Sequence, residues 1–426
     1  MANQKIFCNV PWHQTHLYWD GSYGACCYES QKLPNQDANI SNTSIIQWHN
    51  SDAMQQFRAR ILGDTPLPEC SLCYQEEAQG LQSKRIRENH KDAIFTEQAF
   101  DESFKQSPWQ DKFTPHTDKL PVDLHVDFGN ECNLACKMCH PGASSKIADL
   151  YTKWKIPYDK KPNWINDSNS WNQLLENIKS VDDLHRIHIM GGEPTVNKKF
   201  YKFIDWLIDN ELTHVSLSFV SNGTRLDKSL LDSLKRFRHT DIEISVEAVG
   251  PTNDYVRQGS NTAQIWDNIY FAASEQTDNL SVVLRSVPQL LTINTYHDYI
   301  LRAKELNLSI QSLPCFWPSY LSVDILPQDI RDSFKENYVN VKNSLSLDST
   351  VNTIAVGRDT SKLDQQLARE CDVMLSLLDS PLPNNVEQQR HTLIEWMMQW
   401  DKQFNFDART FYPEYKEFLE SYGYTV

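Results

Sequence analysis

The chain has 426 residues, and 40% of them are hydrophobic, which is enough to form the buried cores of two or three domains. Its formal net charge is -15 and no block of Lys and Arg occurs, so the composition argues against a surface that binds duplex nucleic acid. Residues 1–6 show no charged segment followed by an apolar run, and no stretch approaches about eighteen consecutive apolar residues. We therefore expect neither a signal peptide nor a membrane span, and a cytoplasmic location.

Ten cysteines occur in the chain, and eight of them precede residue 140. Disulfide bonds rarely persist in the reducing cytoplasm, whereas metal binding and redox chemistry commonly use cysteine thiols. This clustering therefore predicts metal or redox sites in the first third of the chain.

Residues 1–80 have the pattern of a small module built from a β-hairpin and a helix. The aromatic-rich residues 16–19 lead into Asp20 and Gly21, a turn sequence that is typical of hairpins. Apolar residues recur at helical spacing within residues 50–62, and a glycine follows as a stop signal. Residues 81–120 are polar and contain prolines, which predicts a helix followed by a linker.

Strand and helix patterns alternate within residues 121–326. Helical patterns such as residues 200–208, 228–237 and 296–306 separate the predicted strands. Six βα units in series predict an α/β fold whose parallel sheet curls into a partial (β/α)6 TIM-like barrel, with its chemistry at the carboxyl ends of the strands. The predicted strands are residues 124–128, 186–190, 215–220, 242–246, 281–287 and 308–313.

Two further regions complete the predicted organisation. Residues 140–182 exceed an ordinary crossover in length and contain three tryptophans, so we predict an inserted lid or loop there. Residues 327–426 show only helical patterns, including residues 363–378 and 386–404, and form a predicted C-terminal helical extension. We expect this extension to pack over one end of the barrel, and the sequence indicates no function for it.

Three cysteines directly follow the first predicted barrel strand. Cys132, Cys136 and Cys139 have the spacing C-x3-C-x2-C, which leaves one iron of a four-iron cluster without a protein ligand. The alternatives are free thiols or a zinc site with His140 as a fourth ligand. The loop resembles the motif of the radical S-adenosylmethionine (SAM) superfamily, which implies that the amino and carboxylate groups of SAM chelate the open iron. Met138 stands where that family usually has an aromatic residue, and its thioether can pack on adenine.

Positions after the later strands resemble the cofactor-binding segments of the same family. Gly191 and Gly192 let the backbone approach a ligand closely and leave N–H and C=O groups free, although an ordinary turn is the alternative. The family usually has an aspartate at the position of Glu247; a carboxylate suits the ribose hydroxyls, and the fork of Arg257 suits the carboxylate of SAM. The cofactor contacts that the resemblance implies are Met138, Gly191, Gly192, Glu193, Ser221, Asn222, Ser245, Glu247, Arg257 and Asn294.

Four cysteines of the N-terminal module form a second set, Cys8, Cys26, Cys70 and Cys73. Their spacing resembles the twitch domain, the one-cluster version of the SPASM auxiliary-cluster domain, which usually follows the barrel but here precedes it. The resemblance implies a second 4Fe-4S cluster that is saturated by protein ligands and would pass an electron instead of binding substrate. Cys27 is the alternative to Cys26, because adjacent strand residues point in opposite directions and only one should face the cluster. A zinc ribbon is the alternative to the cluster.

The resemblance implies an enzyme with SAM and two 4Fe-4S clusters, in which Cys132, Cys136 and Cys139 are catalytic and a flavodoxin- or ferredoxin-type donor supplies electrons. Its 5′-deoxyadenosyl radical would abstract hydrogen from an unactivated C–H bond. An electron-accepting auxiliary cluster favours oxidative modification or cross-linking of a peptide or protein substrate. Dehydrogenation or rearrangement of a small amino sugar or nucleotide-derived metabolite is the alternative. A non-catalytic iron–sulfur electron carrier or sensor is a third hypothesis, and it leaves the glycine and acidic positions of the barrel unexplained.

Overall fold

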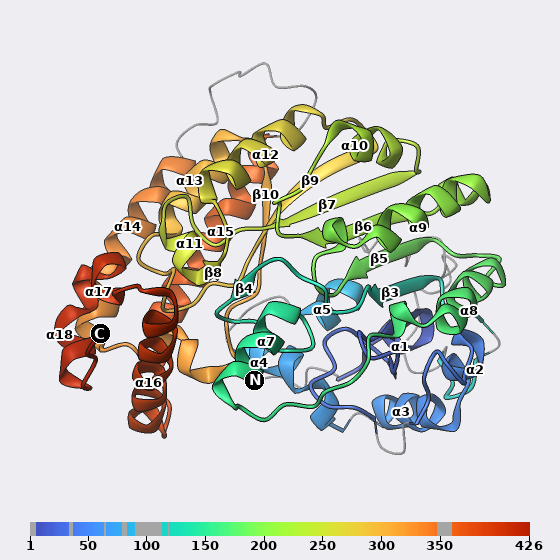
Figure 1. Cartoon of the computed structure of the whole chain (residues 1–426), viewed down its shortest axis with the longest axis horizontal. Coiled ribbons are helices and arrows are strands. Elements are labelled where there is room, and N and C mark those ends of the chain that lie inside the picture. Colours follow the sequence, from blue (N-terminus) through green and yellow to red (C-terminus); the bar gives the residue numbers. More distant parts are fainter. Residues whose placement is uncertain are drawn as a thin grey trace. The chain divides into compact units, whose positions relative to one another are not determined.

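The computed structural model describes residues 6–33, 37–63, 65–78, 83–89, 113–117, 119–346 and 360–426. Strands alternate with helices along much of this length, so the fold is of the α/β class (Figure 1). Most of residues 81–120, the predicted helix and linker, lies outside the described residues. The chain divides into two compact units. The first contains Met1–Asn133, His140–Val220 and Asp232–Thr240, and the second contains Leu134–Cys139, Ser221–Leu231 and Asp241–Val426.

The sheet of the first unit is mostly parallel. Strands β6, β5, β3 and β1 are neighbours in that order and run parallel, and β2 pairs antiparallel with β1. In this register His16 of β1 stands opposite His125 of β3, and His125 stands opposite His188 of β5. The strands are β1 Gln14–Leu17, β2 Tyr23–Gly24, β3 Asp123–Asp127, β5 Arg186–Met190 and β6 Ser216–Ser221.

The predicted N-terminal hairpin is present, but its first strand also belongs to the parallel sheet. All four residues of β1 pair with β3, which is the first strand of the predicted barrel. The N-terminal segment therefore extends the sheet of the first unit. Its sequence could not show this pairing, because β1 and β3 are far apart along the chain and strand pairing leaves no local pattern.

The two faces of this sheet differ in chemistry, because successive side chains of a strand point to opposite sides. On the apolar face Phe219 of β6 packs against Phe200 of α9, with ring centroids 5.1 Å apart. On the other face the aligned residues are polar, and His125, His188 and Ser218 are all buried there. Buried polar side chains need hydrogen-bond partners, so this face depends on specific pairs.

The helix predicted at residues 50–62 is present in the first unit as α3. It begins at Asp52, because the hydroxyl of Ser51 accepts a hydrogen bond from the backbone N–H of Met54 and caps the helix. The helices are α1 Val10–His13, α2 Ile45–His49, α3 Asp52–Leu62, α4 Ser71–Ala78, α5 Lys84–Asn89, α7 Ser145–Trp154, α8 Ser168–Lys179 and α9 Lys198–Asp209.

Residues 140–182 contain α7 and α8 and contribute to the packed interior of the first unit. Trp164 is buried, and its Nε1 donates a hydrogen bond to the carbonyl of Asp127 at 2.9 Å. The ring centroid of Trp171 lies 6.1 Å from those of Phe128 and Phe203. Two of the three tryptophans therefore stabilise the core, in contrast to the predicted lid.

In the second unit β10, β9 and β7 are neighbours in the sheet, and β9 and β10 run parallel. A short strand β4 pairs antiparallel with β8. All six predicted barrel strands are present, each with ends within three residues of the prediction, and the partial (β/α)6 TIM-like barrel class is confirmed. The strands of this unit are β4 Ala135–Cys136, β7 His239–Ser245, β8 Arg257–Gln258, β9 Leu280–Ser286 and β10 Ser309–Ser312.

The C-terminal extension is helical, as predicted. Helices α15 and α16 coincide with the predicted patterns at residues 363–378 and 386–404. Within the described residues, none of the helices has both the length and the apolar character that a membrane span requires. The helices of the second unit are α10 Lys228–Leu234, which it shares with the first, α11 Thr252–Val256, α12 Thr262–Ser274, α13 Tyr296–Glu305, α14 Gln328–Ser346, α15 Thr360–Leu378, α16 Val386–Phe404, α17 Ala408–Phe411 and α18 Lys416–Ser421.

Candidate iron–sulfur sites

The first half of the three-cysteine loop is fixed to the segment that follows the loop. The carbonyl of Asn130 accepts a hydrogen bond from the backbone N–H of Ser145 at 2.6 Å, and its side-chain amide donates to the carbonyl of Pro141 at 2.7 Å. The backbone N–H of Cys132 donates to Ser145 Oγ at 3.1 Å. These bonds hold Cys132 against the first residue of α7.

The second half of the loop belongs to the second unit and carries Cys136 and Cys139. The β4–β8 ladder places Cys136 opposite Arg257, and Arg257 Nη1 donates to Cys136 Sγ at 3.6 Å. A hydrogen bond with Cys139, together with burial, raises the pKa of the Cys136 thiol well above its usual value, and Arg257 opposes that shift. The thiols of Cys136 and Cys139 thus lie in contact, and the Arg257 guanidinium lies beside Cys136.

Gly191 and Gly192 allow two loops of the first unit to cross in close contact. The φ of Gly191 is +85°, where a β-carbon is strained. A β-carbon on Gly191 would collide with the carbonyl of Gly129, and one on Gly192 would overlap the carbonyl of Glu131. The N–H of Gly192 donates to Gly129 at 3.0 Å, and the N–H of Glu193 donates to Glu131 at 2.7 Å. The glycines therefore bring the backbone to the cysteine loop, and these N–H groups are not free for a ligand as the sequence suggested.

Three of the predicted cofactor contacts shape tight turns at the carboxyl ends of β5 and β6. The side-chain oxygens of Glu193, Ser221 and Asn222 each accept a hydrogen bond from the backbone N–H two residues later, at 3.0, 3.1 and 3.0 Å. All three residues are buried. These bonds give each side chain a local structural role beside any contact with a cofactor.

Glu247 and Arg257 of the second unit bind each other. Glu247 is fully buried, and its Oε1 accepts hydrogen bonds from Arg257 Nε at 3.1 Å and Nη2 at 2.5 Å. The second oxygen accepts from the backbone N–H of Val287 at 2.8 Å. Burial opposes ionisation of Arg257, but the Glu247 carboxylate raises the pKa of the guanidinium above its usual value. The acid and the arginine that were predicted for different ends of the cofactor are therefore partners in this structure.

The remaining predicted contacts are more peripheral. Met138 and Ser245 are partly exposed. The amide of Asn294 donates to Glu414 Oε1 at 2.7 Å, so this side chain binds the C-terminal extension.

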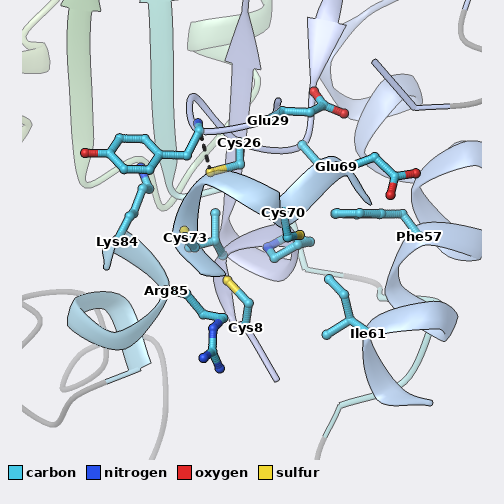
Figure 2. A pocket seen from close by; sticks show the side chains of 14 residues that line it. Cys8, Cys26, Glu29, Phe57, Ile61, Glu69, Cys70, Cys73, Lys84 and Arg85 are labelled. Atoms are coloured by element: carbon cyan, nitrogen blue, oxygen red, sulfur yellow. Dashed lines mark hydrogen bonds between the residues drawn. The ribbon is translucent and has the colours of Figure 1, made fainter. Parts of the chain in front are cut away.

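Cys8, Cys26, Cys70 and Cys73 surround one cavity of the first unit (Figure 2). They come from three segments, which precede α1, follow β2 and span the start of α4. Burial and the nearby Cys70 and Cys73 raise the pKa of the Cys8 thiol well above its usual value. The fold therefore gathers the four predicted auxiliary ligands around one space.

Cys27 is not among the residues that line this cavity. Its Sγ accepts a hydrogen bond from Lys84 Nζ at 3.1 Å. A hydrogen bond with Cys26, together with the charges of Lys84 and His125, holds the pKa of the Cys27 thiol well below its usual value. Because β2 ends at Gly24, both cysteines lie beyond the strand and the alternation expected from the sequence does not apply.

Carboxylates in the wall of the cavity are neutralised. Arg60 binds Glu69 through two hydrogen bonds of 2.6 and 3.0 Å. Burial raises the pKa of Glu29 to about 7, and Tyr18 donates a hydrogen bond to Glu29 at 3.1 Å. Lys84 and Arg85 share this wall with the two carboxyl groups, and the charge around a cluster is one of the factors that set its potential.

The thiols provide the donor chemistry of a four-ligand cluster. Within the described ranges, no group of three or more His, Cys, Asp or Glu side chains is arranged to hold a single metal ion. A 4Fe-4S cluster uses four thiolates around a large centre, whereas a tetrahedral zinc ion would need the same sulfurs drawn closer together. The four cysteines fit the cluster by number and by their position around a cavity.

One polar network of the first unit was missed in the sequence. Asp123 accepts hydrogen bonds from Arg186 at 2.9 and 2.8 Å and from Gln14 at 2.7 Å, and His125 Nε2 lies 3.0 Å from Arg186 Nη2. The available signal was the alternation of polar and apolar residues in the strands at residues 123–127 and 186–190. That alternation marks a polar face, but it does not show which residues pair across strands.

Comparison with known families and proteins agrees with these two sites. Residues 126–288 match the model of the radical SAM superfamily, and residues 8–74 match SPASM, an iron–sulfur cluster-binding domain. Both cysteine sets lie within the matched ranges, whereas Asn294 lies outside them. The chain therefore contains a radical SAM domain and carries a SPASM domain ahead of it.

The curated relatives match only part of this chain, and this chain matches only part of each relative. Mycofactocin maturase MftC of Mycobacterium tuberculosis (strain CDC 1551 / Oshkosh) is 31% identical over 139 residues, which is 32% of this chain and 30% of the relative. The same protein of Mycobacterium ulcerans (strain Agy99) is 32% identical over 145 residues, 34% of each chain. The chain thus spans about a third of the length of these curated relatives.

Solved structures share less similarity. The structure described as native anSMEcpe with bound AdoMet is 17% identical with a TM-score of 0.42, over 53% of this chain and 62% of the other. Streptococcus suis SuiB bound to precursor peptide SuiA is 14% identical with a TM-score of 0.34, over 52% and 47%.

Proposed function

We propose that the chain is a radical SAM enzyme in which Cys132, Cys136 and Cys139 hold a 4Fe-4S cluster whose fourth iron binds SAM. One observation carries this proposal: the C-x3-C-x2-C loop follows β3 in a chain that also gathers four further cysteines around a cavity. Three thiolates leave one iron open, and four saturate a second cluster. An electron carrier would have no use for the open iron.

The open cluster would supply one electron to cleave SAM and so generate the 5′-deoxyadenosyl radical that abstracts hydrogen from substrate. The chain's own residues would hold the reacting groups in place. Arg257 fixes a positive charge beside Cys136, and Glu247 fixes Arg257. The crossing of Gly191 and Gly192 over the cysteine loop holds the carboxyl end of β5 beside Glu131.

Ten residues remain our proposed cofactor contacts, although several of them also make the structural bonds described above. They are Met138, Gly191, Gly192, Glu193, Ser221, Asn222, Ser245, Glu247, Arg257 and Asn294.

The four cysteines of the N-terminal cavity would hold the auxiliary 4Fe-4S cluster, which accepts an electron. Abstraction of one hydrogen atom leaves a carbon radical on the substrate. The cluster held by Cys8, Cys26, Cys70 and Cys73 would supply the electron acceptor, so that loss of an electron and a proton from the substrate would give a new double bond or a cross-link and a product that lacks two hydrogen atoms. A flavodoxin- or ferredoxin-type protein would supply the electron for the first step and remove the electron from the auxiliary cluster.

We propose a peptide or protein substrate. The similarity to mycofactocin maturase, whose name describes maturation, supports this choice within the radical SAM segment. The proposed domains are residues 1–80 for the auxiliary cluster, 81–120 for a helix and linker, 121–326 for the barrel and 327–426 for the helical extension. We also propose that the enzyme acts in the cytoplasm.

The test of cofactor cleavage is anaerobic reconstitution followed by dithionite and SAM. We expect 5′-deoxyadenosine from the native protein and none from a variant in which Cys132, Cys136 and Cys139 are alanine. If the native protein contains about eight irons but releases no 5′-deoxyadenosine, the proposal that it is a radical SAM enzyme is refuted.

The test of the substrate is mass spectrometry of short peptides encoded beside the gene after incubation with the reconstituted protein. A mass loss of two hydrogen atoms supports a peptide substrate. Turnover of a small amino sugar or nucleotide instead, with every peptide unchanged, would refute it.

A further inference from the structure

Lys137 lies within the three-cysteine loop, between Cys136 and Met138, and its side chain is completely buried in the second unit. Three aromatic rings surround its ammonium group. The Nζ atom is 3.9 Å from the ring centroid of Tyr255, 4.6 Å from that of Trp400 and 5.4 Å from that of Trp396. This arrangement is an aromatic cage around a cation.

Asp401 of α16 closes the cage. Its Oδ1 lies 3.8 Å from Lys137 Nζ, which is an ion pair but too long for a hydrogen bond. Its Oδ2 accepts hydrogen bonds from Tyr255 at 3.1 Å, from Tyr424 at 2.5 Å and from the backbone N–H of Ala408 at 3.1 Å. The carboxylate is therefore fixed by three donors and cannot move away from the lysine.

The backbone of the same loop is bound to the same element. Lys137 N–H donates to the carbonyl of Val256 at 2.8 Å, beside the β4–β8 ladder. Tyr255, one wall of the cage, precedes Val256 in α11. Backbone and side chain thus attach this segment to α11, and the side chain also reaches α16.

Burying an ammonium group without a hydrogen bond is costly, and an apolar residue of similar volume commonly costs less. Cation–π contacts offset part of that cost. A cage that encloses the lysine directly after a proposed cluster ligand therefore indicates a specific attachment of the loop, beyond ordinary core packing.

We propose that Lys137 is a positioning residue that fastens the segment with Cys136 and Cys139 to helix α16 of the C-terminal extension. The role of Lys137 in positioning the cluster rests on the proposed function. The contacts that attach the loop to α16 do not depend on a cluster. It assigns a role to the C-terminal extension, namely to hold two ligands of the SAM-binding cluster.

Amide hydrogen exchange in the iron-free protein tests the attachment. Lys137→Met keeps the length of the stem and removes the ammonium group, and Trp400→Leu removes one wall. We expect each change to speed exchange in residues 134–139 by about tenfold. Because the two residues act through one contact, the double variant should exchange no faster than the faster single variant. Trp317→Leu is the matched control, because Trp317 is 66% exposed in the same unit and should have no effect.

Equal exchange in all variants, or effects that multiply in the double variant, would overturn the attachment. Residues of α12 serve as the internal reference for global unfolding. If Trp400→Leu does not fold, Trp396→Leu replaces it, because that ring is the most distant wall of the cage.

The role toward the cluster needs a spectroscopic readout. In reduced, reconstituted Lys137→Met we expect altered g-values for the signal that responds to SAM and an unchanged signal from the other cluster. An unaltered spectrum would refute a role in positioning the cluster. Absence of any SAM-responsive signal in the native protein, with the exchange results intact, would refute the proposed function and leave the attachment standing.

Discussion

Gln14 in the N-terminal hairpin donates a hydrogen bond of 2.7 Å from its side-chain amide to the carboxylate of Asp123, and the two residues stand opposite each other where β1 pairs with β3. Arg186 of β5 binds the same carboxylate with two hydrogen bonds. A single buried acid thus joins three strands of the first unit. One of these strands leads into the segment with the auxiliary cysteines, so the SPASM domain and the first barrel strands share one sheet.

Asp123→Asn should strongly destabilise the first unit. Burial opposes ionisation of Asp123, but Arg186 and His125 hold the pKa of its carboxyl well below the usual value, so the native residue is charged. Asparagine cannot balance the charge of Arg186, and breaking a buried ion pair in this way costs about 3 kcal/mol. The midpoint of urea unfolding should fall accordingly. Asp149→Asn, at an exposed position of α7, is the control, and an equal effect in both variants would show that the pair contributes nothing.

The strands and the three-cysteine loop could be predicted from the sequence because their signals are local, whereas the four auxiliary cysteines were predicted from their resemblance to the twitch domain. Alternating strand and helix patterns fall within a few residues of each element, and C-x3-C-x2-C is contained in one loop. The pairing of Gln14 with Asp123 is different, because it joins residues more than a hundred positions apart. The same is true of Lys137 and Asp401, which form a buried ion pair, although nothing in the local sequence marks Lys137 as a buried residue.

Gly191 and Gly192 show a second limit of prediction from the sequence. From the sequence we predicted that the backbone at Gly191 and Gly192 approaches a ligand closely, and the structure shows a close approach to another part of the chain. The neighbour is the loop before Cys132, and the reason is steric: the carbonyl of Glu131 occupies the space that a β-carbon on Gly192 would need.

Gly192→Ala should therefore displace the start of the cysteine loop. The added methyl group would overlap the carbonyl of Glu131, and the N–H of Glu193 would lose its 2.7 Å hydrogen bond to that carbonyl. Overpacking of this kind costs about 1–3 kcal/mol. Urea unfolding of the iron-free protein measures the loss, and iron content after reconstitution measures the effect on the cluster.

Gly250→Ala is the matched control for this change, because a β-carbon at Gly250 would meet no atom within 4 Å beyond its own chain neighbours. We expect its unfolding midpoint and iron content to match those of the native protein. Equal stability of Gly192→Ala would mean that the two loops separate freely.

Cys26→Ala should abolish the auxiliary cluster, whereas Cys27→Ala should retain it. Cys26 lines the cavity with Cys8, Cys70 and Cys73, and the Cys27 sulfur is bound by Lys84 instead. Iron should fall from about eight to about four per chain in the first variant and stay near eight in the second. Cys371→Ala, which changes a buried thiol in α15, controls for the loss of a cysteine. The reverse pattern of iron contents would assign Cys27 as the ligand, and stoichiometric zinc in place of iron would assign a zinc ribbon.

Because His49 is buried, we expect the free energy of unfolding of the first unit to fall in mild acid. The ring is fully buried, and its Nε2 lies 3.1 Å from Arg58 Nη2. A guanidinium can only donate, so Nε2 is an acceptor and the ring is neutral, with Nδ1 facing Thr15 Oγ1 at 3.4 Å. Burial and the charge of Arg58 lower the pKa of His49 well below its usual value near 6.5.

The sign of the effect follows from proton binding. Below pH 6.5 the unfolded chain binds a proton at His49 and the folded chain does not, so stability falls as the pH falls and is unaffected above pH 6.5. Each pH unit below that value should cost about 1.4 kcal/mol until the folded pKa is reached. His49→Gln keeps an acceptor for Arg58 and removes the titration. Urea unfolding should therefore show that the His49→Gln variant loses less stability than the native protein between pH 7.5 and 5.5. The expected difference is about 1.4 kcal/mol. His214→Gln, at an exposed position of the same unit, is the control for replacing a histidine by glutamine. If His49→Gln loses as much stability as the native protein over this range, the ring must already be charged or accessible in the folded state, and the neutral acceptor beside Arg58 is refuted.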